Sequence, residues 1–239
     1  MYLCPPQILY IRELLRIMGR IINILYIHGM GGGGDSRIPS ILKQHINNAI
    51  PPEYGVYVNV TVRTYSFDPE QGARQIALWM EELKPSMVVG ESLGALQTIR
   101  IQGIPHILVS PSLNAPLYLG NLAFLALIPG ITLLLDKIYK PKEGDRQRLH
   151  FSFRILRKYR EHRKIALKNS PAMGGQDLFH AFFGIHDHYR KSGIVCLKTW
   201  KKYFGNTFEI YDGTHFMEEE YIHSLLIPKI LNTLEINRE

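Results

Sequence analysis

Short runs of apolar, β-branched residues alternate along this chain with segments whose apolar residues recur at helical spacing. The runs are too short for buried helices and end at glycine, proline or polar residues, which is typical of buried strands. The run VYVNVTVRTY also alternates with period two. Six strands are expected, at IINILYIH, VYVNVTVRTY, SMVVGE, HILVSPS, DLFHAFFG and TFEIYDG.

Helical segments are expected between and after these strands. Asp68-Pro69 opens one that runs to about Leu83, because aspartate caps a helix and proline suits its first turn. The other helices are expected at residues 38–49, 93–102, 188–203 and 217–236. Apolar strands that alternate with helices predict an α/β three-layer sandwich, with a mostly parallel sheet covered on both faces.

Ligands of such sheets bind beyond the carboxyl ends of the strands. Functional residues are therefore expected just after Ile27, Gly90, Gly184 and Tyr211.

Residues 114–170 interrupt the strand-helix pattern. Leu117–Leu135 is nineteen residues without a charge. The later part carries apolar residues at helical spacing, opposed by arginine and lysine; these are Phe151, Ile155, Tyr159 and Ala166. The segment is interpreted as a helical cap inserted into a core formed by residues 21–113 and 171–239.

Length and composition agree with one globular domain that carries an insertion. The chain has 239 residues, of which 46% are hydrophobic and 21% charged, so global disorder is excluded. Residues 136–168 hold twelve Lys/Arg against four Asp/Glu, a local charge of +8 within a net charge of +7. One basic segment, not a basic fold, explains the charge, and a nucleic-acid partner is discounted.

Two cysteines, Cys4 and Cys196, exclude a disulfide framework and fit a reducing, cytoplasmic location. Residues 1–20 are a leader in which prolines and charges interrupt the apolar run, unlike a secretory signal. Met18 is the expected natural start, because MGRIINILYIHG opens directly into a strand.

The sequence Gly90-Glu91-Ser92-Leu93-Gly94 fits the G-x-S-x-G pattern of a nucleophile elbow. A serine on a sharp strand-to-helix turn lies clear of the sheet, and side chains two residues away would clash, so both positions are glycine. A strand precedes the motif and a helix follows it. The alternative is a tight turn with no chemical role.

The loop after the first strand, His28-Gly29-Met30-Gly31, is the expected second half of an oxyanion hole. An attacked carbonyl needs two N–H donors, which Leu93 and Met30 would supply. Gly29, Gly31 and Gly34 also spell a dinucleotide fingerprint, but the second strand lacks the acidic residue that this motif wants at its end. His28 is interpreted as a packed anchor for the loop.

A serine nucleophile needs a base, and the base needs an orienting carboxylate. Asp187 follows the fifth strand and His215 the sixth, which gives the chain order Ser92, Asp187, His215. Asp212 and Asp177 are weaker candidates, since one shapes a turn and the other precedes its strand. A metal site at His186-Asp187-His188 lacks a supporting ligand pattern.

These motifs resemble the α/β-hydrolase superfamily over residues 21–113 and 171–239. The resemblance rests on the His-Gly loop, the GESLG elbow, a G-x-x-D loop and the D-G-T-H turn. It implies a compact six-stranded version, as in small bacterial esterases, with Ser92, Asp187 and His215 as a triad and no cofactor or metal.

The expected activity is hydrolysis of a small-molecule carboxylic ester or thioester through an acyl-enzyme. The alternatives are a catalytically silent scaffold that binds ligands, and amide cleavage or acyl transfer by the same residues. Leu117–Leu135 would line an acyl pocket. It is also compatible with a membrane span or, beside the basic segment, with docking on anionic lipid as a lipase or acyltransferase would; a merely solvated basic face is favoured.

Overall fold

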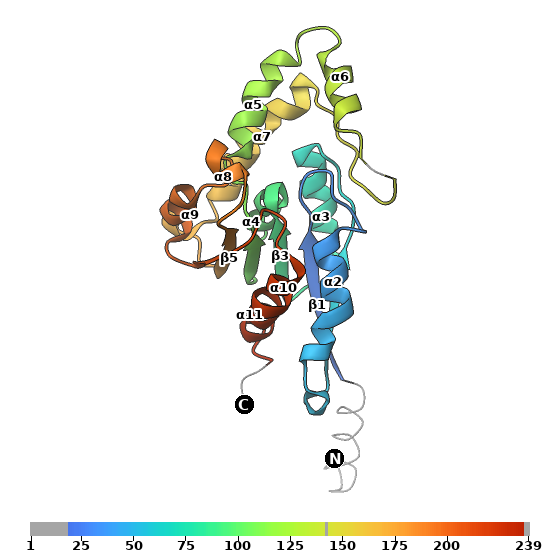
Figure 1. The fold of residues 1–239 in the computed structure, drawn as a ribbon, viewed down its shortest axis with the longest axis vertical. Helices are drawn as coiled ribbons and strands as arrows, with labels where there is room; N and C mark the ends of the chain where they lie inside the picture. The colour runs from blue at the N-terminus through green and yellow to red at the C-terminus, as the bar shows by residue number, and fades with distance from the viewer. Residues whose placement is uncertain (1–18, 142, 237–239) are drawn as a thin grey trace, which may run out of the picture.

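The computed structural model describes residues 19–141 and 143–236. Within these residues six strands form one sheet, and every neighbouring pair is parallel, in the order β2-β1-β3-β4-β5-β6 (Figure 1). The strands are β1 (Arg20–Ile27), β2 (Val56–Val62), β3 (Met87–Glu91), β4 (His106–Val109), β5 (Phe179–Gly184) and β6 (Phe208–Tyr211). The α/β class and the six strands are confirmed, and the sheet is wholly parallel.

Helices follow most strands, as the alternating pattern predicted. The α-helices are α2 (Arg37–His45), α3 (Pro69–Leu83), α4 (Ala95–Arg100), α5 (Ala115–Leu125), α6 (Ile131–Ile138), α7 (Phe153–Leu167), α8 (Tyr189–Ser192), α9 (Leu197–Phe204), α10 (Glu219–Tyr221) and α11 (Ile227–Thr233). Short 3-10 turns lie at Ile46–Ala49, Pro52–Tyr54, Ser92–Gly94 and Pro171–Met173, and a π turn at Ile222–Leu226.

Several elements differ in their limits from the sequence expectation. β1 begins at Arg20, one residue before the expected start of the core, while the proposed start at Met18 lies outside the described residues. The helix expected over 93–102 opens as a 3-10 turn, and the one expected over 188–203 is divided at Gly193. Asp68 caps α3 as predicted, since its carboxylate accepts hydrogen bonds from the N–H groups of Glu70 and Gln71.

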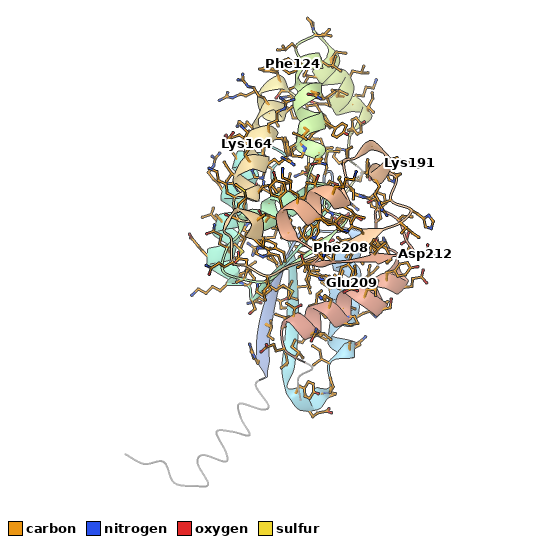
Figure 2. All side chains as sticks on the ribbon, turned by 90° about the vertical axis from the view of Figure 1, so that its left-hand side faces the viewer. Phe124, Lys164, Lys191, Phe208, Glu209 and Asp212 are labelled. Carbon is orange, nitrogen blue, oxygen red and sulfur yellow. The ribbon has the colours of Figure 1, made fainter. Side chains whose placement is uncertain are left out.

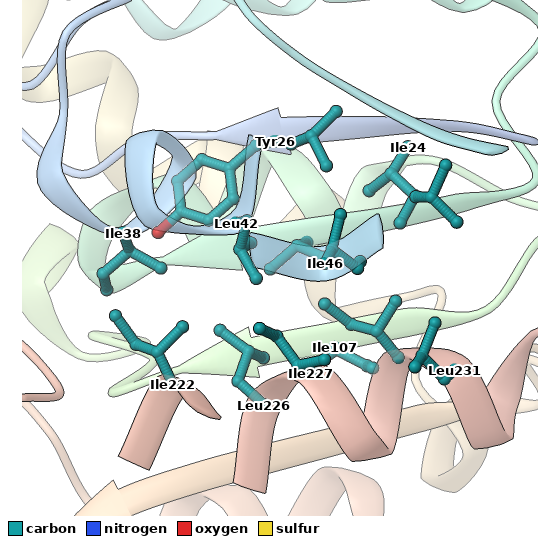
Figure 3. Packing of buried hydrophobic residues seen from close by; sticks show 14 of the residues in the cluster. Ile24, Tyr26, Ile38, Leu42, Ile46, Ile107, Ile222, Leu226, Ile227 and Leu231 are labelled. Atoms are coloured by element: carbon teal, nitrogen blue, oxygen red, sulfur yellow. The ribbon is translucent and has the colours of Figure 1, made fainter. Parts of the chain in front are cut away.

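Alternate residues of β1 enter different cores, which is why this strand is apolar throughout. Ile24 and Tyr26 face α2 and α11, whereas Leu25 and Ile27 face α3. Figure 3 shows the first of these cores, where Leu42 of α2 lies near apolar side chains of the C-terminal helices. Helices therefore cover both faces of the sheet. The loops at the ends of its strands remain available for a functional site.

Residues 114–170 form α5, α6, α7 and the loops between them. The charge-free stretch Leu117–Leu135 does not make one helix, because Pro129 and Gly130 interrupt it and Gly130 adopts a φ of 85°. None of the helices in the described part of the chain has the length and apolarity to cross a membrane.

Helix α7 ties this segment to the sheet. Leu156 and Tyr159 are buried in the same cluster as Leu96 and Ile99 of α4, and the Tyr159 hydroxyl donates to the carbonyl oxygen of Phe67 at 2.6 Å. Helices α5 and α6 extend away from the sheet beyond its carboxyl edge (Figure 1). The segment thus has one helix in the core and two that project from it.

Candidate active site

Ser92 occupies the turn between β3 and α4 with a φ of 50°, in the left-handed region that side chains rarely adopt. The flanking glycines are required by close packing. A Cβ on Gly90 would lie 2.1 Å from Thr98 Oγ1, and one on Gly94 would lie 2.3 Å from the carbonyl oxygen of His28. The local sequence therefore produces a strained elbow that holds the serine hydroxyl at the carboxyl edge of the sheet.

Three strand ends bring Ser92, His215 and Asp187 into one hydrogen-bonded chain. His215 Nε2 lies 2.8 Å from Ser92 Oγ, and His215 Nδ1 lies 2.7 Å from Asp187 Oδ2. The side chains of His215 and Asp187 are 2% and 0% exposed. The other carboxylate oxygen of Asp187 accepts the N–H of Tyr189 at 2.8 Å, which fixes the carboxylate plane. This geometry can move a proton from the hydroxyl to the imidazole.

Aromatic rings and a second hydroxyl surround the imidazole and the serine. The rings of Tyr189 and Phe216 stand nearly perpendicular to His215 at centroid distances of 4.7 and 5.2 Å. Ser112, just after β4, has its Oγ 3.1 Å from Ser92 Oγ. Sequence reasoning did not identify Ser112; its position after a buried strand was the available signal.

The glycine loop after β1 approaches the elbow closely. A Cβ on Gly29 would lie 3.0 Å from Ser92 Cβ, and Met30, Leu93 and Ser92 line the same cavity. The N–H of Gly31 donates to Gln147 Oε1 at 3.1 Å. The loop after β1 and the elbow at Ser92 therefore lie side by side at the cavity.

Gln147 holds this loop and was missed in the sequence. Gln147 is buried, and its side-chain nitrogen donates to the carbonyl oxygen of Tyr65 at 3.1 Å. Its backbone N–H donates to the carbonyl oxygen of Gly32 at 2.7 Å. The N–H of Gly34 donates to the Asp145 carboxylate at 3.2 Å. A dinucleotide phosphate would need the backbone N–H groups of this loop. The N–H groups of Gly31 and Gly34 are instead bonded to Gln147 and Asp145.

A cavity of about 390 Å³ opens beside Ser92. Its lining includes Tyr118 and Leu119 of α5 and also Arg37 and Arg146. Arg146 pairs with Asp35 at 2.7 Å, and Arg37 donates to the carbonyl oxygen of Met217 at 2.6 Å. Cavities of this size suit small ligands.

Solved structures share this arrangement of sheet and helices. A monoacylglycerol lipase from Paleococcus ferrophilus superposes with a TM-score of 0.57 at 17% identity, over 90% of this chain and 97% of that one. Est1E from Butyrivibrio proteoclasticus, determined with ferulic acid bound, superposes with a TM-score of 0.55 at 14% identity, over 90% of each chain.

A peroxisomal α/β-hydrolase from Saccharomyces cerevisiae, Lpx1, superposes with a TM-score of 0.54 at 12% identity, over 95% of this chain and 80% of that one. The chain has the α/β-hydrolase fold. No family model matches the sequence, and no curated protein matches it.

The two competing acids, Asp212 and Asp177, bond groups other than His215. Asp212 lies on the surface (Figure 2) and bonds His186 Nε2 at 2.8 Å. Both side chains are well exposed. Asp177 accepts the N–H of Gly103 at 2.9 Å. Among the described residues, the side chains of His45, Glu219 and His223 lie close enough together to bind one metal ion. This group does not include His186, Asp187 or His188.

His28 is packed beneath the glycine loop, as expected for an anchor. It is fully buried, its ring stacks on Tyr65 at 4.4 Å, and its Nδ1 bonds the carbonyl oxygen of Gly29 at 2.7 Å. Burial lowers the pKa of His28 from 6.5 to about 4. Burial raises the pKa of the neighbouring Glu91 carboxyl, whose oxygen accepts the Tyr26 hydroxyl at 2.9 Å.

Acidification is expected to destabilise the protein through His28. Between pH 6.5 and about 4 the unfolded chain binds a proton on this imidazole and the folded chain does not, so the free energy of unfolding falls as the pH falls. Glu91, with its raised pKa, acts in the opposite sense. Thermal melts over this range should therefore show a smaller loss of Tm in His28→Gln than in the natural protein; an equal or larger loss would contradict the assignment.

Proposed function

We propose that the protein is a serine hydrolase that cleaves a small-molecule carboxylic ester or thioester through an acyl-enzyme. The observation that carries the proposal is the chain of hydrogen bonds from Asp187 through His215 to Ser92, on the wall of a cavity. Ser92 is the nucleophile, His215 the general base and acid, and Asp187 the orienting carboxylate. The esterases and lipases that share the fold agree with this class of reaction.

The first half of the reaction forms the acyl-enzyme. His215 Nε2 accepts the proton of Ser92 Oγ while that oxygen bonds to the substrate carbonyl carbon. The resulting oxyanion accepts hydrogen bonds from the N–H groups of Leu93 and Met30. His215 then gives its proton to the leaving alcohol or thiol as the bond to carbon breaks.

Water completes the reaction by the same steps. It loses a proton to His215 as its oxygen attacks the acyl carbon, and the proton passes to Ser92 Oγ as the acid leaves. Throughout, Asp187 keeps the Nδ1 proton of the imidazole in place and stabilises the charged ring.

Residues 114–170 act in this proposal as a cap on a core of residues 21–113 and 171–239. Tyr118 and Leu119 support this role, because they line the cavity from α5. The apolar wall that they form would hold the acyl group of the substrate.

Labelling with a fluorophosphonate tests the proposal without knowledge of the substrate. The natural protein should be labelled on the peptide that carries Ser92, whereas Ser92→Ala and His215→Ala should not be labelled. An unlabelled, folded natural protein would support the silent scaffold instead. Labelling that persists in Ser92→Ala would show that another residue is the nucleophile.

Met30→Ala is expected to change kcat/KM for an ester no more than a fewfold. Met30 contributes a backbone N–H, which alanine retains, and its side chain is 40% exposed. Removal of a true oxyanion donor costs about 10²–10³ in rate, so the two cases differ clearly in steady-state kinetics. A loss of all activity in Met30→Ala would mean that the side chain itself is needed.

A further inference from the structure

Large apolar side chains are exposed together where α5 ends and α6 begins. Each is more than half exposed, and we call this set the apolar tip: Phe124, Leu125, Leu127, Ile128, Leu133, Leu134 and Ile138. In Figure 1 this part of the chain lies at the end of the molecule opposite the amino ends of the strands, and Figure 2 labels Phe124 there. A contiguous apolar surface of this kind marks a site of interaction.

The inner side of α5 is already packed, so the apolar tip is not a poorly buried core. Ala123 is 1% exposed within the cluster that includes α7, and Gly120 lies so close to α7 that a Cβ there would be 2.3 Å from Arg160 Nε. A surface helix of a globular protein normally presents polar residues on its outer side. The outer side of α5 instead exposes Phe124 and Leu125, which are 62% and 53% exposed.

Positive charge surrounds the apolar tip. Arg154 and Arg157 lie in the first turns of α7, beside Phe153, whose ring is 6.2 Å from that of Phe124. Lys137, in the last turn of α6, and Lys140, just after this helix, are exposed. We call these four residues the basic collar, and in the described part of the chain none of them forms an ion pair.

Asp136, the acid nearest in sequence to the collar, forms no ion pair with any of its four residues. Asp136 accepts hydrogen bonds from His150 Nδ1 at 2.7 Å and from the N–H of Phe151 at 2.8 Å. The exposed face therefore combines apolar side chains with cations that form no ion pair among the described residues, the combination that binds an anionic lipid surface. A second copy of this chain fits less well, because it would bring two basic collars together.

We propose that the apolar tip and the basic collar dock this protein on the surface of an anionic lipid bilayer. The apolar side chains enter the boundary between headgroups and acyl chains, while the collar lies against the lipid phosphates. Docking is at the surface, since no described helix can span the bilayer. It needs no chemistry at Ser92.

The position of α5 links this surface to the cavity. Tyr118 and Leu119, near the start of α5, line the cavity, and the end of the eleven-residue helix carries Phe124 and Leu125. A helix of that length spans roughly 16 Å. Docking would therefore bring the cavity close to acyl lipids at the bilayer surface, a consequence that rests on the proposed function.

Sedimentation with vesicles tests the docking. The natural protein should bind vesicles of phosphatidylcholine mixed with phosphatidylglycerol, and bind phosphatidylcholine vesicles much more weakly. Arg154→Gln with Arg157→Gln should lower the partition coefficient on anionic vesicles roughly 25-fold. Leu133→Ser with Leu134→Ser should lower it at least about tenfold, because two side chains that enter the boundary are lost.

Matched control residues lie on the surface of the protein away from the apolar tip and the basic collar. Leu78 of α3 is 64% exposed, so Leu78→Ser removes exposed apolar surface away from the tip. Arg74→Gln, also in α3, removes a single exposed charge there. Both should bind vesicles as the natural protein does. Ser92→Ala should also bind, so that a failure of docking is distinguishable from a failure of the proposed chemistry.

Three results would overturn the docking proposal. One is equal binding of anionic vesicles by the natural protein and by the variant Leu133→Ser with Leu134→Ser. Another is no preference for anionic over zwitterionic vesicles. The third is a natural protein that does not bind vesicles and is a dimer by light scattering, while the variant Leu133→Ser with Leu134→Ser is a monomer. Fluorophosphonate labelling without vesicles, measured for each variant that retains Ser92, shows whether the region around this residue remains intact.

Discussion

Ser92→Ala is expected to lower kcat for ester hydrolysis by about 10⁵–10⁶-fold. The Ser92 hydroxyl lies 2.8 Å from the imidazole that would take its proton, so no bond to the substrate carbonyl carbon can form once this oxygen is removed. Stability should change little, because among the described residues the hydroxyl hydrogen-bonds only the side chains of His215 and Ser112, a loss of about 1 kcal/mol. Steady-state hydrolysis of a chromogenic short-chain ester, with a thermal melt of each protein, measures both effects.

Ser112→Ala is the matched control for this prediction. Its hydroxyl is 3.1 Å from that of Ser92 and is buried, yet it makes no hydrogen bond to His215. We expect its removal to lower kcat less than about tenfold, as for a neighbour that orients the nucleophile. If Ser112→Ala removed activity while Ser92→Ala retained it, the roles assigned to the two hydroxyls would be reversed.

The parts of this fold that the sequence predicted depend on local chemistry. The apolar runs around Ile24 and Val88 form strands because each is buried on both faces, and a chain of β-branched residues suits that environment. The elbow at Ser92 was visible because close packing by Thr98 and by the loop after β1 leaves room only for glycine two residues away. Strand-end positions then placed Asp187 and His215 at the same edge.

The parts that the sequence did not predict depend on contacts between distant segments. Gln147 reaches Gly31 across 116 positions, and nothing in the residues around Gln147 indicates that contact. The burial of Tyr159 against the layer over the sheet was likewise hidden, since helical spacing shows that a face is apolar but not what covers it. The division of the apolar stretch Leu117–Leu135 into two helices was also hidden, because the break at Gly130 depends on the geometry of the folded chain.

Asp187→Asn is expected to lower kcat for the same ester by about 10⁴-fold. Asp187 Oδ2 lies 2.7 Å from His215 Nδ1, and its other carboxylate oxygen is held by the N–H of Tyr189. An amide at this position can present its N–H₂ group to Nδ1, which favours the tautomer whose proton is on Nε2 and cannot accept one from Ser92. KM should change little, because Asp187 does not line the cavity.

Asp212→Asn distinguishes an orienting role from a general loss of negative charge near the histidine. Asp212 lies three residues from His215 in the chain, but its carboxylate bonds His186 on the surface, 73% exposed. An exposed pair of this kind contributes little, so kcat should stay within about threefold of the natural value. A large loss in Asp212→Asn with a small one in Asp187→Asn would mean that the imidazole is oriented from the opposite side during the reaction. Comparable losses in both variants would mean that negative charge near His215 supports the reaction, and not the hydrogen bond to its Nδ1.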